Sequence, residues 1–216
     1  MTEPYRARGA LDYGWAKFQA SPATLMVPMM VVFVGLVVTG LALQLILARV
    51  DTGSGLTGAL LVTGLFSTVM FLVYQLSAAG LYRGALQVVD GRPFGIGELL
   101  DGWDKQQVLI AGVLTALAVG VGTTLCVVPG LVVAFLTQFT LLFVVDRGMS
   151  AVEAVRASVD LVRRHLGATV VLFLLSAAVT LLGAVLCGVG LLVAVPVVLI
   201  GYAYTFRRLQ DQPVVS

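Results

Sequence analysis

Charged residues are scarce in this chain of 216 residues: they make up 11%, whereas hydrophobic residues make up 59%. A soluble domain carries about 25% charged residues, because its apolar core needs a polar surface. The mean hydropathy of +1.04 indicates that the lipid bilayer is the solvent for most of the chain. The near balance of 13 basic and 11 acidic residues excludes the strongly positive surface typical of nucleic-acid binding.

Residues that carry chemistry are also few. The single histidine, His165, follows Arg163 and Arg164, a setting that favours a polar interfacial residue over a catalyst. The sequence contains no phosphate-binding loop, zinc-ligand spacing or nucleophile triad. Its apolar runs contain no ionisable residue, which argues against an ion-coupled transporter. We therefore expect no catalytic residue, no cofactor and no metal.

Two small groups of residues leave alternatives open. Glu98, Asp101 and Asp104 lie at i, i+3 and i+6, where they form either the solvated face of a helix or a site for Mg²⁺ or a basic partner. The spacing favours the solvated face. Cys126 and Cys187 fall at the outer ends of two apolar runs and either pair in an oxidising compartment or stay free, with the free state favoured.

The apolar runs predict an all-α membrane protein with six transmembrane helices. A helix needs about 20 apolar residues to cross the hydrocarbon core. The predicted spans are Ala23–Ala48, Leu56–Tyr82, Val108–Val128, Gly130–Val145, Ala168–Cys187 and Leu191–Phe206. Residues 1–20 form a cytoplasmic segment without a cleavable signal peptide, residues 21–208 the membrane domain, and residues 209–216 a cytoplasmic tail.

The distribution of positive charge predicts the orientation. Twelve of the 13 basic residues lie on one side of the predicted spans, and Arg49 alone lies on the other. The positive-inside rule makes the first side cytoplasmic. We therefore expect a multi-pass protein of the inner membrane with both termini in the cytoplasm.

The cytoplasmic segments repeat one design, a short amphipathic helix before a transmembrane hairpin. Apolar residues recur at helical spacing over 11–18, 96–103 and 152–166, and Ser150 with Glu153 predicts a capping box. Such helices are expected to lie on the inner leaflet. The turns at 127–130 and 187–190 contain the Pro and Gly typical of reversals. The pattern predicts three repeated hairpins, and Cys126 and Cys187 occupy equivalent positions.

Small and polar residues in the predicted spans are candidates for helix–helix interfaces. Small residues recur every four positions, which lets membrane helices approach closely. Gln138 lies in the middle of the fourth span, where an unpaired amide is costly, so we expect it to face another helix. The candidate interface residues are Gly112, Ala116, Gly120, Thr124, Ser176, Thr180, Ala184 and Gln138. Arg156, Arg163 and Arg164 are candidates for cytoplasmic docking to lipid phosphates or a partner.

Two motifs carry a resemblance. They are Asp12–Phe18 and the string Pro129–Leu131, Phe135, Asp146–Ala154, Ser158 and Leu161. The chain resembles an uncharacterised family of bacterial six-helix inner-membrane proteins, similar to the membrane domain of glycerophosphodiester phosphodiesterases and to actinobacterial glycine- and proline-rich transmembrane proteins. The resemblance implies a fold but no activity, because the phosphodiesterase's catalytic barrel is absent from this sequence.

These observations favour a non-enzymatic membrane protein, a scaffold or accessory subunit of a membrane complex. The expected partners are membrane lipids and either other membrane proteins or further copies of this chain, without nucleic acid. An alternative is binding or transport of a lipid or small amphiphile, with the Gln and Thr side chains as its polar lining. A second alternative is a lipid-modifying enzyme, which only the acidic cluster Glu98–Asp104 favours.

Overall fold

A computed structural model describes residues 7–20, 22–49, 55–92, 101–185 and 190–214. Over these ranges the chain is all-helical, as predicted, with nine α-helices and no strand. The helices are α1 (Ala7–Ala20), α2 (Pro22–Arg49), α3 (Gly55–Val89), α4 (Lys105–Leu125), α5 (Val127–Leu136), α6 (Thr140–Arg147), α7 (Ala151–Arg164), α8 (Leu166–Val185) and α9 (Leu191–Arg208).

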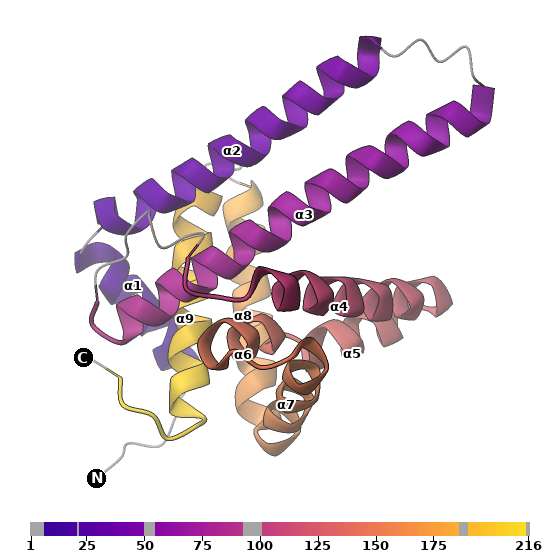
Figure 1. The fold of residues 1–216 in the computed structure, drawn as a ribbon. Helices are drawn as coiled ribbons and strands as arrows, with labels where there is room; N and C mark the ends of the chain where they lie inside the picture. Colours follow the sequence, from indigo (N-terminus) through magenta and orange to yellow (C-terminus); the bar gives the residue numbers. More distant parts are fainter. Residues whose placement is uncertain (1–6, 21, 50–54, 93–100, 186–189, 215–216) are drawn as a thin grey trace.

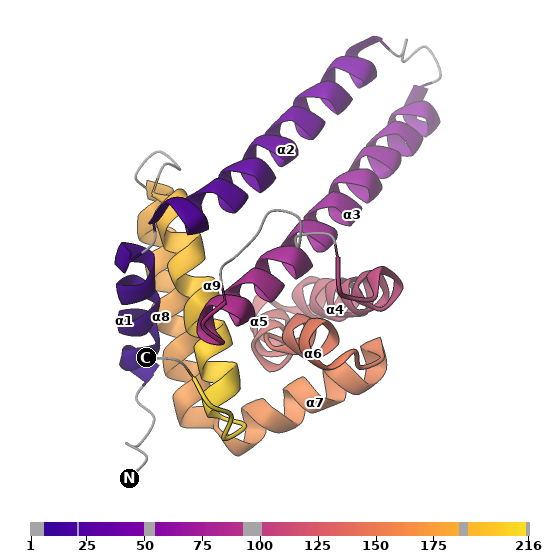
Figure 2. The same cartoon turned by 60° about the vertical axis from the view of Figure 1, so that its left-hand side comes forward.

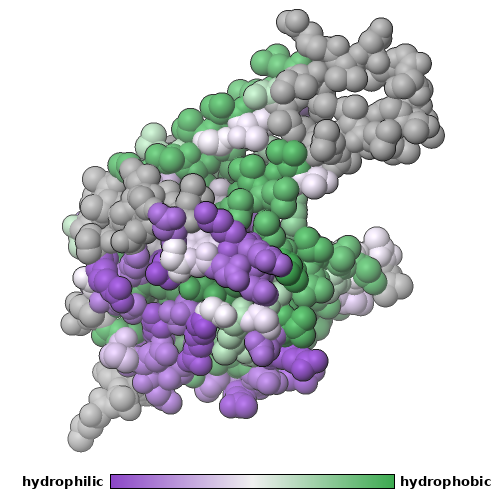
Figure 3. Space-filling model, viewed as in Figure 1, coloured by the Kyte–Doolittle hydropathy of each residue, from purple (hydrophilic) through white to green (hydrophobic). Residues whose placement is uncertain are grey.

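Three pairs of neighbouring helices, α2–α3, α4–α5 and α8–α9, diverge from a common base (Figure 1). α1 lies alongside α8 and α9, and α7 crosses the lower end of the molecule (Figure 2). Hydrophilic side chains gather over that end, around α6, α7 and the end of α9, whereas the surface along α2, α3 and α4 is hydrophobic (Figure 3). The polar and apolar parts of the chain therefore occupy separate regions.

Four described segments are long and apolar enough to cross a membrane: Lys105–Thr124, Val127–Arg147, Leu166–Val185 and Leu191–Arg208. They match the third to sixth predicted spans, and they indicate a membrane protein. α2 and α3, of 28 and 35 residues, occupy the first two predicted spans. Within α2, Met26–Ala42 is a shorter apolar stretch. Six spans and a repeated hairpin therefore stay predictions.

The fourth span differs from the continuous helix predicted over Gly130–Val145. α5 ends at Leu136 and α6 begins at Thr140, with a turn over residues 137–139. The Ser158 hydroxyl of α7 donates to the Leu136 carbonyl (2.8 Å) and accepts from the Phe139 N–H (3.1 Å). Because apolar surroundings offer no water to an open backbone, these two bonds make the break tolerable.

The reversal between α4 and α5 falls before the turn predicted at residues 127–130, which belong to α5. Cys126 alone links the two helices, in an extended conformation. Pro129 lies in the first turn of α5, where a missing N–H costs no hydrogen bond. Next to this link the backbones of α4 and α5 are in close contact. A Cβ added to Gly122 would lie 2.8 Å from the Gly130 Cα. In the third hairpin, a Cβ on Gly190 would lie 2.8 Å from the Gly183 Cα.

α7 confirms the predicted helix and its capping box, in which Glu153 accepts from the Ser150 N–H (3.2 Å) and hydroxyl (2.7 Å). Its residues that are buried within the described chain are Ala151, Ala154, Ser158, Leu161 and Val162, whereas Val152 is exposed. The small side chains let α7 lie close to α6. Contact of its apolar face with the inner leaflet stays a prediction.

α1 packs against α9, and its position on the inner leaflet stays a prediction. Gly14 allows the contact: a Cβ at this position would lie 2.5 Å from the Val197 carbonyl oxygen. Ala10 is fully buried, and the rings of Tyr13 and Tyr204 lie 4.5 Å apart. Trp15 is 47% exposed. Of the other predicted surface helix, over residues 96–103, only 101–103 fall within the described ranges.

Candidate functional site

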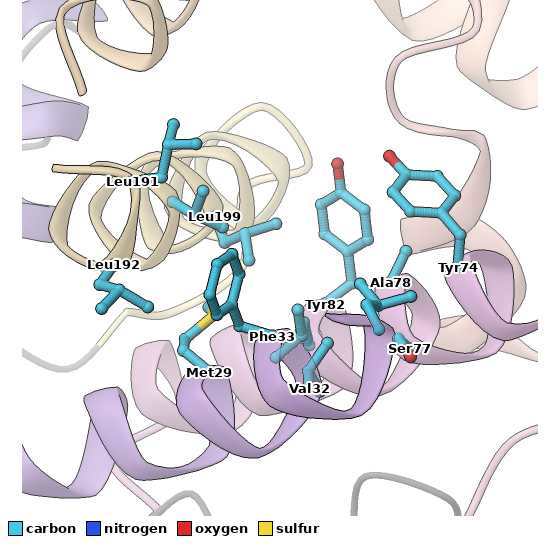
Figure 4. Close-up of a pocket in the computed structure, with 13 residues that line it drawn as sticks. Met29, Val32, Phe33, Tyr74, Ser77, Ala78, Tyr82, Leu191, Leu192 and Leu199 are labelled. Carbon is cyan, nitrogen blue, oxygen red and sulfur yellow. The ribbon is translucent and has the colours of Figure 1, made fainter. Parts of the chain in front are cut away.

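An apolar cleft lies between α2, α3 and α9 and is the most enclosed of the described hollows (Figure 4). Its volume is about 390 Å³, within the range of about 300–1,000 Å³ typical of small-molecule sites. It forms because α2 and α3 lean away from the outer half of α9 (Figure 2). Its walls are Met29, Val32, Phe33 and Leu36 of α2, Tyr74, Ser77, Ala78, Leu81 and Tyr82 of α3, and Leu191, Leu192, Val195 and Leu199 of α9.

The chemistry of this cleft is almost entirely hydrocarbon. Among the described residues, Ser77, Tyr74 and Tyr82 supply the only polar side-chain atoms of the cleft, and no charged residue lines it. In Figure 4 the rings of Tyr74 and Tyr82 stand side by side, and Phe33 and Met29 reach toward the leucines of α9. In the described part of the chain, no carboxyl, imidazole, amino or thiol group lines the cleft that could activate these hydroxyl groups. They fit an apolar chain.

At the base of the molecule, Arg207 joins the ends of three helices. Its guanidinium donates to both carboxylate oxygens of Asp90, after α3, at 3.1 and 2.9 Å. It donates to both oxygens of Asp146, at the end of α6, at 2.8 Å each, and to Gln212 at 2.6 Å. All five guanidinium N–H groups are thus used. We call Asp90, Asp146 and Arg207 the basal cluster.

The basal cluster is partly shielded from water, since the Arg207 side chain is 12% exposed. Asp90 and Asp146 lie near helix C-termini, where the helix dipole disfavours negative charge. Arg207 offsets this penalty for both, and Arg92 lies 3.8 Å from Asp90. Beside the cluster, Arg147 donates to Gln210. The cluster thus links the ends of α3, α6 and α9.

The candidate residues on α4 do not line one interface within the chain. Gly112 is buried against the Gln75 amide, which occupies the space that a Cβ would need. Ala116, Gly120 and Thr124 are exposed, and a Cβ on Gly120 would meet no described atom within 4 Å. The close contact to α5 uses Gly122 instead. Packing of the exposed stripe against another chain stays a prediction.

The candidate residues on α8 lie together in a second groove, between α8 and α9. Ser176, Thr180 and Ala184 line it with Tyr202 of α9. Gln138 faces another helix, as expected: its Oε1 accepts from the Tyr202 hydroxyl at 3.1 Å. Four of the eight candidate interface residues therefore lie in this groove or next to it.

The remaining candidates are placed as follows. Arg156, Arg163 and Arg164 are exposed on α7, so their role in docking stays a prediction. Nearby, the hydrogen bonds from Ser150 lower the pKa of the Glu153 carboxyl. Cys126 is exposed and unpaired, whereas Cys187 lies outside the described ranges.

The acidic cluster was predicted over residues 98–104. Asp104 caps α4 by accepting from the backbone N–H groups of Gln106 and Gln107 at 2.9 and 3.2 Å. Asp101 is exposed, and Glu98 lies outside the described ranges. In the described part of the chain, no three His, Cys, Asp or Glu side chains are grouped to hold a metal ion.

Sequence reasoning did not identify the basal cluster, Ser158 or the apolar cleft. It assigned Arg207 to topology alone, and Asp146 and Ser158 appeared only within the motif that carried the resemblance. The only signal in the sequence was the position of these residues. The charged residues of the basal cluster lie at the ends of apolar helices, and Ser158 lies among the small residues of an amphipathic helix.

Comparisons with known proteins give the following matches. The profile of a family described as "Domain of unknown function (DUF7847)" matches residues 94–215. The chain is 33% identical over 225 residues to "Uncharacterized protein Rv2560" of Mycobacterium tuberculosis, an alignment that covers 96% of this chain and 69% of that protein. "Uncharacterized protein Mb2590" of Mycobacterium bovis matches with the same identity and coverage. No solved structure matches significantly.

Proposed function

This chain belongs to the DUF7847 family, and from that premise we propose that it is a non-enzymatic, multi-pass membrane protein that holds the apolar chain of a membrane lipid between α2, α3 and α9. The observation that carries this proposal is the apolar cleft, about 390 Å³ in volume and lined by hydrocarbon apart from three hydroxyl groups. A lipid chain is the apolar ligand that a bilayer supplies.

The proposed topology has six spans, with both termini on the cytoplasmic side of the inner membrane. The length of α2 and α3 supports the first two spans. The excess of basic residues on one side supports the orientation. The glycine contacts Gly122–Gly130 and Gly183–Gly190, at corresponding places in two hairpins, support an internal repeat. Kinship with the membrane domain of glycerophosphodiester phosphodiesterases remains part of the proposal.

Photolabelling tests lipid binding in the cleft. The protein is reconstituted in phosphatidylcholine vesicles that contain a phosphatidylcholine with a diazirine on one acyl chain, and labelled peptides are mapped by mass spectrometry. We expect labelling of 29–36, 74–82 and 191–199 to exceed that of exposed α4. Ala78→Trp fills the cleft and should reduce the excess several-fold. Leu117→Trp, at a position 62% exposed on α4, should leave it unchanged. Even labelling of every lipid-facing helix in both variants would refute the proposal.

A second candidate function is the scaffold or accessory subunit of a membrane complex. The observation that favours it is the exposed small-residue stripe Ala116, Gly120 and Thr124, which no described helix covers. Exposed small residues are the kind of surface on which membrane helices of separate chains pack. Purification from native membrane tests it: a stoichiometric protein partner, or a homo-oligomer, that Gly120→Leu removes would support this function. A monomer unchanged by Gly120→Leu would refute it.

A further inference from the structure

A third groove lies where α1 runs beside α8 and α9 (Figure 2). Its volume is about 490 Å³. It shares no residue with the apolar cleft, which uses other residues of α9. Its walls are Leu11, Asp12 and Trp15 of α1, Val179, Leu182 and Gly183 of α8, and Gly190, Val193, Ala194 and Val197 of α9.

The contacts of α1 place this groove beside the apolar middle of α9. A Cβ on Gly201 would lie 3.3 Å from the Ala10 carbonyl oxygen, and a Cβ on Gly14 would lie 2.5 Å from the Val197 carbonyl oxygen. α1 therefore runs antiparallel to α9, and Asp12 lies between these two contacts. Both α8 and α9 are apolar enough to cross a membrane. Their residues in the groove are aliphatic or glycine, so Asp12 lies next to hydrocarbon.

Asp12 is the one charged residue among the described walls of this groove, and it has no basic partner there. It is exposed, and none of the described salt bridges involves it. The ammonium group of Lys17, on the same helix, lies over the Tyr13 ring at 5.4 Å from the ring centroid. A carboxylate next to hydrocarbon is unfavourable unless a cation pairs with it. The groove therefore favours a positively charged ligand.

Trp15 supplies a second group that attracts a cation. It lies one helical turn from Asp12, lines the same groove and is 47% exposed. Its ring stacks on that of Phe18, with the ring centroids 5.9 Å apart, and this contact supports the indole. The face of an indole attracts an ammonium group. A carboxylate and an exposed indole, one turn apart, together form a surface for an organic cation.

Other classes of ligand fit the groove less well. One carboxylate supplies too few oxygen ligands for a metal ion, and no group of metal ligands occurs in the described part of the chain. An anionic headgroup would be repelled by Asp12, and a neutral chain would leave the carboxylate without a counter-ion. The class that satisfies both the carboxylate and the aliphatic walls is an ammonium group that carries a hydrocarbon chain.

We propose that the groove between α1, α8 and α9 binds a lipophilic cation. The ammonium group of the ligand pairs with the Asp12 carboxylate and lies against the Trp15 ring. Its hydrocarbon chain lies along Val179, Leu182 and Val193. Because this groove and the proposed lipid-chain cleft have no residue in common, either site can fail its test alone.

The test compares two diazirine probes of equal chain length, an alkyltrimethylammonium and the corresponding primary alcohol. The protein is reconstituted in vesicles of digalactosyldiacylglycerol, a neutral bilayer lipid without an ammonium group. Labelling of residues 11–15, 179–183 and 190–197 is divided by that of exposed α4, so that unequal partition of the probes into the vesicles cancels. We expect this labelling ratio to be several-fold higher for the ammonium probe. Asp12→Asn should lower it on the order of fivefold for the ammonium probe and leave it unchanged for the alcohol.

Three further variants serve as controls. Asp160→Asn removes an exposed carboxylate of α7, outside the groove, and should change neither ratio. Asp12→Glu keeps the carboxylate and should keep the preference for the ammonium probe. Trp15→Leu removes the indole and should lower the ammonium ratio by about two- to fivefold.

Folding is checked by thermal melting of each variant in detergent. Asp12→Asn should melt like the parent, because Asp12 has no described ion pair to lose. Should it melt lower, Trp15→Leu serves as the second variant. Equal ratios for the two probes in the parent would overturn the proposal and indicate a neutral lipid in the groove. An ammonium ratio that neither variant lowers, or that Asp160→Asn lowers as much as Asp12→Asn does, would also overturn it.

Discussion

At the residue scale, single side chains supply hydrogen-bond and ion-pair partners to backbone groups and charges that have no such partner within their own helix. Ser158 serves two backbone groups at the break in the fourth span, and Arg207 serves two carboxylates. The chain also contains a residue of the same type that lacks these partners: Ser176 for Ser158, and Arg208 for Arg207. Paired substitutions can therefore separate the interaction from the chemistry of the side chain.

Ser158→Ala should destabilise the protein by about 2 kcal/mol or more. The change leaves the Phe139 N–H and the Leu136 carbonyl without the partner that Ser158 supplies, and an unsatisfied buried group costs about 1–3 kcal/mol. Ser176→Ala is the matched control, because that serine is also buried but has no described partner. The measurement is the melting temperature in detergent. Similar values for the two variants would show that Ser158 does not stabilise the break.

Stability should fall at alkaline pH through Tyr13. Burial, followed by the neighbouring Tyr204 and Asp90, raises the pKa of Tyr13 to about 12 from 10.0. The folded chain thus holds this proton more tightly than the unfolded chain does. The resulting stability is present below pH 10 and is lost as the pH rises toward 12. Melting at pH 9 and 11 should show a smaller drop for Tyr13→Phe than for the parent; an equal drop would exclude Tyr13 as a cause.

At the element scale, the helix pairs are defined by where backbones touch. Gly122 of α4 meets Gly130 of α5, whereas Gly120, two residues away, faces no described atom. The small-residue stripe in the sequence indicated Gly120. Residues two apart on a helix point in nearly opposite directions, so an error of two positions moves the interface to the other side of the helix.

Gly122→Leu should therefore separate α4 from α5 and lower the stability by at least about 2 kcal/mol, because overpacking forces the backbone to shift. Gly120→Leu should leave the stability of the isolated chain unchanged or slightly higher, since leucine favours the helix. Thermal melting in detergent measures both. A parent-like Gly122→Leu would contradict the contact, and a destabilised Gly120→Leu would indicate that a second chain covers this stripe.

The helices and the capping box of α7 could be predicted because their signals are local: apolar runs, and Ser150 three residues before Glu153. The break at residues 137–139 could not, because Ser158 compensates it from another helix. Apolar spacing indicated that α7 is amphipathic, whereas its contact within the chain uses the small residues Ala151, Ala154 and Ser158. The apolar cleft depends on how far α2 and α3 lean from α9, which no local pattern encodes.

At the scale of the whole molecule, the basal cluster links three elements at one end. Arg207 lies at the end of α9, Asp90 follows α3, and Asp146 lies at the end of α6. No pair of these residues is close in the sequence, so the cluster had no local signature. One side chain, that of Arg207, thus bridges all three elements.

Arg207→Gln should destabilise the protein by about 2–4 kcal/mol, because two carboxylates of like charge lose their shared partner in a partly buried site. Arg208→Gln is the control, since Arg208 contacts only Tyr204 among the described hydrogen bonds. Adding Asp146→Asn to Arg207→Gln should recover part of the loss by removing one charge. Melting of Arg207→Gln, Asp146→Asn, their double variant and Arg208→Gln measures the coupling, and full additivity would argue against a shared ion-pair network.

Reporter fusions test the topology. Fusions at Gly91, at Met149 and after the C-terminus should report the cytoplasm, because these positions share the side with most basic residues. A fusion at Ser54, between α2 and α3, should report the opposite side. A cytoplasmic signal from Ser54 would show that α2 and α3 do not cross the membrane as a hairpin.

The contact between α1 and α9 has a consequence for how the protein is made. α1 leaves the ribosome before α9, yet Gly14 rests against the Val197 carbonyl, and Ala10 is buried in the same contact. α1 must therefore wait, without this partner, until α9 has been synthesised and inserted. Contacts between distant parts of a chain form late. A chain truncated before α9 is thus expected to expose α1 to proteases and chaperones, whereas insertion of α9 covers it.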